Sequence, residues 1–79
     1  MATVYAVANS NGPYAAHMSL ALAQAAVEAD RRRYEQHPAD YRWDEETGAD
    51  GIRVWQLKVK GLTGRWAKAY RSIHELPIG

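Results

Sequence analysis

Basic and aromatic side chains are mixed in the last third of the chain, where residues 51–73 read GIRVWQLKVKGLTGRWAKAYRSI. This segment holds six Lys or Arg side chains together with two Trp and one Tyr. Basic groups neutralise phosphates and aromatic rings stack on bases, so the combination suits a nucleic acid or another acidic partner. An ordinary amphipathic sheet has the same composition, and its charged face then contacts only water. The arrangement of these side chains in space decides between the two.

The residues 61–64, which read GLTG, predict the loop of a β-hairpin formed by strands 52–60 and 65–73. If these four residues form the loop, Lys60 pairs with Arg65. Aromatic and apolar residues then share one face of the hairpin: Trp55, Leu57, Val59, Trp66 and Tyr70. The other face is basic and carries Lys58, Lys60, Arg65 and Arg71.

A slip of the hairpin by one residue turns every side chain of one strand to the other face. It places Lys58 opposite Lys68 and Trp66 opposite Lys60. Because like charges directly opposite each other are destabilising, we prefer the first register. That register leaves Lys68 on the apolar face, where its stem can lie flat. It separates the aromatic residues, which we expect to pack against a helix, from the basic ones.

Five basic residues are therefore the candidate contacts to an acidic partner: Lys58, Lys60, Arg65, Arg71 and Arg53. The segment 52–71 also resembles the strand pair of AP2-type and integrase arm-binding DNA-binding domains, which lay a three-stranded sheet in the major groove. The resemblance implies that the same five residues would contact DNA. Those domains place their helix after the sheet, whereas the helix expected here precedes it. A solvated basic face that binds nothing remains the alternative.

Two further motifs have simpler interpretations. The GLTG sequence matches the GXXG loop with which KH domains clamp a nucleic-acid backbone, but that loop joins two helices. Here the flanking segments are strands, so we interpret it as a hairpin turn. The run Arg31-Arg32-Arg33 falls near the end of a predicted helix, where its side chains point in different directions. We interpret it as a solvated helix end.

No motif predicts a metal site or a catalytic centre. The acidic residues of 44–50 lack the EF-hand pattern, and Ser72 has no nucleophile motif around it. The histidines do not show the His-x-x-x-His spacing of a metal-binding helix. They are His17, His37 and His74. We expect a protein that is not an enzyme and has no cofactor.

The size and composition of the chain narrow the possibilities. Its 79 residues fit one domain, residues 1–79, with a net charge of +1 and no cysteine. A domain of this size has a stability of roughly 4 to 12 kcal/mol, which leaves little to spend on a strained active site. No apolar run is long enough to span a bilayer, and the first residues lack the features of a signal peptide. We therefore predict a cytoplasmic protein with no membrane partner.

The order of the predicted elements is β-β-α-β-β-β, an α+β fold with an antiparallel sheet and one helix packed on one face. The asparagine-glycine turn at 9–13 joins the first two strands. Ser19 suits the N-cap of an alanine-rich helix whose apolar stripe is Ala23, Ala26, Val27 and Tyr34, and Pro38 ends this helix. The predicted ranges are 3–8, 14–18, 20–36, 41–45, 52–60 and 65–73.

Residues 3–34 resemble small uncharacterised proteins of actinobacteria and their phages. The shared features are a first strand of the VYAV type, at 4–7, and an alanine-rich helix that ends AAVEADRRRY, at 25–34. The resemblance implies an accessory protein of phage or mobile-element origin. Our leading functional hypothesis is an interaction protein that binds another protein or itself, for example as a homodimer paired through sheet edges. The second hypothesis is a nucleic-acid-binding module that uses the basic face of the hairpin.

Overall fold

The computed structural model describes residues 2–35, 39–48, 50–62 and 64–78, and in this part of the chain it has five strands and one helix. In chain order they are β1 (Ala2–Asn9), β2 (Gly12–His17), α1 (Leu20–Tyr34), β3 (Asp40–Thr47), β4 (Arg53–Lys60) and β5 (Trp66–Ile78). The predicted α+β class is confirmed, but the predicted boundaries match only roughly, since β5 continues well beyond residue 73. The helix ends at Tyr34, and the predicted stop at Pro38 lies outside the described residues.

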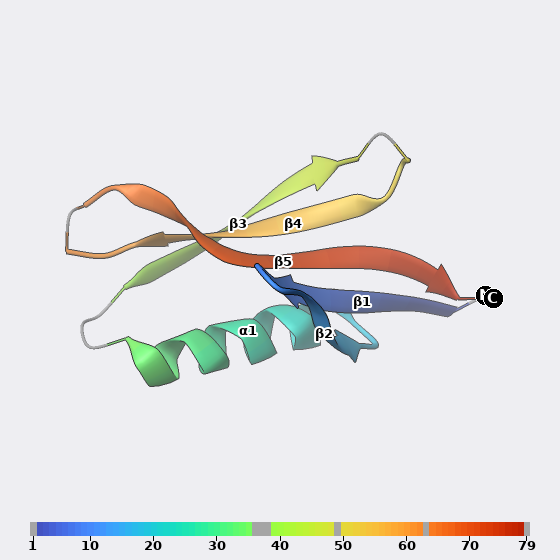
Figure 1. The fold of residues 1–79 in the computed structure, drawn as a ribbon, viewed down its shortest axis with the longest axis horizontal. Coiled ribbons are helices and arrows are strands. Elements are labelled where there is room, and N and C mark those ends of the chain that lie inside the picture. Colours follow the sequence, from blue (N-terminus) through green and yellow to red (C-terminus); the bar gives the residue numbers. More distant parts are fainter. Residues whose placement is uncertain (1, 36–38, 49, 63, 79) are drawn as a thin grey trace.

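The strands form one antiparallel sheet in the order β2-β1-β5-β4-β3. The long strand β5 lies in the centre and pairs with both β1 and β4, so it joins the N-terminal hairpin to the C-terminal meander. Helix α1 connects the two edge strands and packs near the β1 and β2 end of the twisted sheet (Figure 1). The opposite face, which we call the open face, is covered by no helix of the described chain.

The core lies between α1 and the helix-side face of the sheet. Ser19 caps the helix as predicted, because its Oγ accepts a hydrogen bond from the amide of Leu22 at 3.1 Å. Of the predicted stripe, Ala23 and Val27 are fully buried, whereas Ala26 and Tyr34 are exposed, so that part of the prediction is wrong. The sheet contributes Val7, Trp55, Leu57, Ala69 and Ile73 to the same cluster.

The preferred register of the β4–β5 hairpin is wrong. Lys60 pairs with Trp66 and Lys58 pairs with Lys68, which is the arrangement that the opposed charges argued against. The reason is burial: Ala69 and Ile73 pack in the core, and a slip by one residue would turn both to the open face. Burying an isoleucine is worth about 1.5–3 kcal/mol, whereas a cross-strand pair is worth about 0.2–1 kcal/mol. Burial of Ile73 therefore outweighs the repulsion between the two lysines and sets the register.

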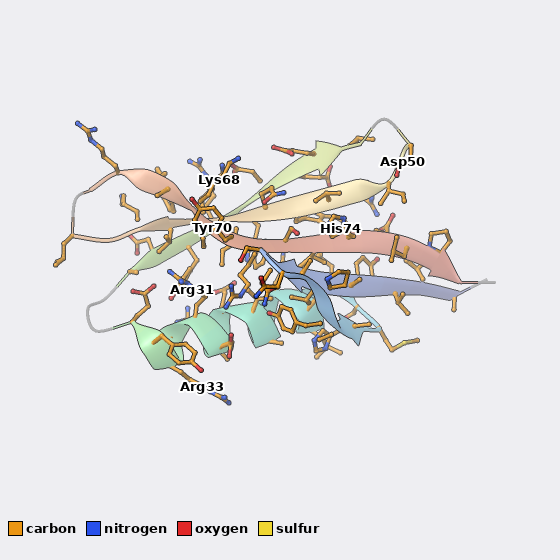
Figure 2. All side chains as sticks on the ribbon, in the orientation of Figure 1. Arg31, Arg33, Asp50, Lys68, Tyr70 and His74 are labelled. Carbon is orange, nitrogen blue, oxygen red and sulfur yellow. The ribbon has the colours of Figure 1, made fainter. Side chains whose placement is uncertain are left out.

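A bulge in β5 makes this register compatible with both neighbouring strands. Gln56 pairs with Ser72 and Lys58 with Lys68, so the segment from Ala69 to Arg71 lies opposite Leu57 alone. Tyr70 at the centre of this segment has a φ of 56°, a left-handed conformation that is unfavourable for a residue other than glycine. The side chain of Tyr70 is largely exposed, and it projects near Lys68 where β5 bends (Figure 2).

Replacing Tyr70 tests the conformational cost of this bulge. We expect Tyr70→Gly to unfold with a free energy about 0.5 to 1 kcal/mol higher than Tyr70→Ala, because glycine tolerates a positive φ. Both variants lose the same exposed ring, so their difference isolates the backbone. Urea denaturation followed by tryptophan fluorescence measures it. Equal stabilities would mean that the bulge does not impose this conformation.

A charged link holds β1, β4 and β5 together on the helix side. Glu75 accepts hydrogen bonds from Arg53 Nε at 3.1 Å and from the Tyr5 hydroxyl at 3.2 Å. Arg53 also lies 3.7 Å from Glu45 of β3. The hydrogen bond from Arg53 is the main reason that the pKa of Glu75 is lowered from its ordinary value of 4.5.

This link predicts a pH dependence of stability. Because the pKa of Glu75 is lower in the folded than in the unfolded chain, the carboxylate stabilises the fold above the unfolded value of 4.5, and the effect is lost as the pH falls through the folded value. Glu75→Gln should therefore flatten the decline in stability below about pH 4.5. Glu46→Gln, on the exposed edge strand β3, is the control and should keep the wild-type profile.

Candidate functional site

The open face carries a cluster of basic side chains around one tryptophan, at the end of the sheet formed by β3, β4 and the start of β5. Two rows of directly paired residues cross these strands. One row is Arg42, Lys58 and Lys68, and the other is Asp40, Lys60 and Trp66. Paired residues project to the same side of a sheet. We call Arg42, Lys58, Lys60, Trp66 and Lys68 the Trp66 patch.

Two cations lie close to the ring of Trp66 in this patch. The guanidinium of Arg42 is 4.6 Å from the centre of the indole ring, and the ammonium of Lys60 is 5.3 Å from it. Trp66 nevertheless remains partly in contact with water, since it is 37% exposed. Stacking of this kind fixes the ring without covering it, which is what a binding platform for a flat ligand requires.

The charges of the patch are only partly compensated. Arg42 forms an ion pair with Asp44 at 3.0 Å, and Lys60 lies 3.9 Å from the exposed carboxylate of Asp40. Within the described part of the chain, no carboxylate forms an ion pair with Lys58 or Lys68, although the two lysines lie directly opposite each other. Two opposed lysines without a counter-ion form a site at which an anion is favoured.

The structure divides the five predicted contact residues between two faces. Lys58 and Lys60 belong to the Trp66 patch, and Arg65 is exposed next to Trp66 in the chain. Arg53 is instead held by Glu75 on the helix side, and Arg71 lies 3.6 Å from Asp30 of α1. The predicted basic face is therefore wrong for Arg71, which the true register and the bulge turn toward the helix. Arg53 lies on the same side of β4 as Trp55 and does not join the other candidate contacts.

Three residues of the patch were not predicted as contacts: Arg42, Trp66 and Lys68. The rejected register already placed Trp66 opposite Lys60, and the alternation in β3 already placed Arg42 on the polar side of that strand. Both signals were present in the sequence. The missing information was the burial of Ile73 against β1, which a hairpin considered alone does not contain.

The other candidate residues do not form a competing site. Arg31 and Arg32 are paired within the helix to Glu35 and Glu28. Gly64 donates a backbone hydrogen bond to Gly61 at 3.1 Å, so the GXXG segment is a turn between strands, with Thr63 outside the described residues.

The groups able to do acid–base or metal chemistry stay scattered. Ser72 Oγ lies 3.1 Å from His74 Nε2, but the two are next-but-one neighbours on β5, and no described carboxylate completes a triad with them. No group of three His, Asp or Glu side chains that could hold a metal occurs in the described chain, and His37 lies outside it. The absence of an enzymatic activity stays a prediction.

Comparison with known proteins gave no match to a family model, to a curated protein or to a solved structure. None of the described helical residues forms a helix long and apolar enough to cross a membrane. Function therefore has to be inferred from the chemistry of the chain's own surface, and the Trp66 patch is the most distinctive part of it.

The opposed lysines of the patch predict a gain in stability when one charge is reversed. Lys68→Glu turns a repulsive cross-strand pair into an attractive one, and we expect the free energy of unfolding to rise by about 0.5 kcal/mol. Lys68→Ala should recover only the part due to lost repulsion. Urea denaturation at low ionic strength measures both. A loss of stability in Lys68→Glu would mean that Lys58 and Lys68 do not repel each other in the folded protein.

Proposed function

We propose that the protein binds single-stranded nucleic acid with the Trp66 patch. One observation carries the proposal: a partly exposed tryptophan shares a sheet face that no described helix covers with the cations of Arg42 and Lys60, both close to its ring. Proteins that bind single strands combine aromatic rings, on which bases stack, with cations that follow the phosphates. Both requirements meet here on one surface.

The two rows of the patch suit different parts of a nucleic acid, one the phosphates and the other the bases. Lys58 and Lys68 have no acidic partner among the described residues, so a phosphate there gains contacts without breaking an ion pair. A base can stack on the exposed part of Trp66 or on the planar guanidinium of Arg42, which already lies against the ring. Such binding needs no catalytic group and reads little sequence.

The register of the hairpin is what favours this function over the protein-binding hypothesis. In the preferred register, aromatic and basic residues lay on opposite faces, which argued against base stacking. In the observed register Trp66 shares its face with Lys58, Lys60 and Lys68. The strongest objection to a nucleic-acid interface is thereby removed, and the proposal uses residues that the sequence alone assigned to the core.

The proposal is tested by fluorescence polarisation with a labelled oligothymidylate of about 15 nucleotides. Loss of stacking in Trp66→Ala should weaken binding roughly 5- to 150-fold. The matched control is Tyr34→Ala, which removes an exposed aromatic ring from the helix and should leave the affinity unchanged. Circular dichroism establishes that both variants are folded.

The salt dependence of binding is a second measure, because a substitution that only disturbed folding would not change its slope in this way. The double variant Lys58→Ala, Lys68→Ala should lower the slope of log affinity against log salt by about 1.4, because each phosphate contact to a single strand contributes about 0.7. Arg33→Ala, which removes one exposed charge from α1, should leave the slope unchanged. No binding at low salt, equal losses in Arg33→Ala, or tighter binding of a duplex would each contradict the proposal.

A further inference from the structure

The two edges of the sheet differ in charge. The edge strand β3 carries charged side chains at most of its positions, and such charges keep sheet edges from pairing with other chains. They are Asp40, Arg42, Asp44, Glu45 and Glu46. The other edge strand, β2, reads GPYAAH and contains no Asp, Glu, Lys or Arg. The charges protect the β3 edge along its length, whereas β2 is blunted only at its start, by Pro13 and a bulge at Tyr14, and pairs regularly at 15–17.

Exposed apolar side chains extend this second edge. Tyr14 is 49% exposed, Met18, which follows β2, is 69% exposed, and Leu22 in the first turns of α1 is 59% exposed. A cavity of about 320 Å³ opens between β2 and α1, and its apolar wall includes Val7 and Val27. An edge strand without charges offers backbone groups to a further strand, and exposed apolar side chains next to it add to the contact.

We infer that the protein forms a two-fold symmetric homodimer in which β2 pairs with β2 of a second copy and the two sheets become one. A second copy is the favoured occupant because an antiparallel pair of identical strands satisfies both edges at once. Each copy has one edge without charged residues in its described sheet, and its charged β3 edge lies at the far side (Figure 1). Association therefore closes at two copies and does not continue into a fibre.

The sequence of β2 restricts the register of this pairing. A two-fold axis perpendicular to the sheet keeps both helices on the same side of the joined sheet. In such a pairing one residue of β2 lies directly opposite the same residue of the second copy, and the axis passes between these two. Pro13 has no amide hydrogen to donate, so a pairing that leaves it out is favoured. An axis at Ala16 does so, since it pairs Ala15 with His17 of the second copy. The bulged Tyr14 and Met18, which follows β2, lie at the two ends of this short pairing, so their exposed side chains flank it.

This register places the two Ala16 side chains directly opposite each other, which permits a charge-swap experiment. Ala16 is exposed in the single chain, so a charged side chain there should not disturb folding. We expect Ala16→Lys and Ala16→Asp each to raise the dissociation constant of the dimer by about tenfold or more, because like charges meet at the axis. An equimolar mixture of the two variants should restore dimers, since opposite charges then meet.

Sedimentation equilibrium between about 5 and 500 μM, a range chosen because a small interface implies micromolar affinity, measures the mass of each sample. The control is Thr47→Lys on the β3 edge, which should dimerise like the wild type. Restored dimers in the mixture also show that both variants fold. Three results would overturn the inference: a wild-type chain that stays monomeric at the highest concentration, Ala16→Lys that dimerises as tightly as the wild type, or a mixture that stays monomeric.

Discussion

Ile73 is fully buried between Trp55 of β4 and Val7 of β1, and this contact sets the position of β5 against both of its neighbours. Within the sheet, the N-terminal hairpin of β1 and β2 meets the C-terminal meander of β3, β4 and β5 only where β1 pairs with β5. If β5 slipped by one residue against β4, Ile73 would leave the core, and the pairing of the two halves would lose its main apolar contact. The first residues of β5, from Trp66 onward, must therefore pair with β4 in the register that this contact leaves to them.

The adaptation is visible in the bulge opposite Leu57. The bulge shifts the register of β5 against β4, so that the start of β5 and the part of β5 that also pairs with β1 are both paired. Two costs remain in the hairpin, the left-handed backbone of Tyr70 and the opposed lysines at 58 and 68. Local strain and uncompensated like charges are retained most often where a surface binds something. The opposed lysines belong to the Trp66 patch and Tyr70 lies two residues after Lys68, so the same constraint that fixes the core also assembles the patch.

The sequence was sufficient for features that depend on local chemistry and periodicity. The Ser19 cap, the turn between β4 and β5, the order of the elements and the alternation in β3 follow from neighbouring residues. The register did not follow, because the comparison of charges within one hairpin omitted the contact between Ile73 and Val7, which lie far apart in the chain. The same omission misplaced Arg71, and the ion pairs that hold Arg71 to Asp30 and Arg53 to Glu75 join different elements, so a hairpin taken alone could not show them.

The strand order places the β2 edge and the Trp66 patch at opposite sides of the sheet. Strand β2 lies at one end of the sheet, and Arg42 of β3 lies at the other, with β1, β5 and β4 between them. A dimer joined through β2 therefore carries its two Trp66 patches at opposite ends of a continuous sheet. A short oligonucleotide can reach only one patch, whereas a strand long enough to span both gains affinity from the second contact without any new residue. Self-association and nucleic-acid binding are thus compatible, because neither uses the surface that the other needs.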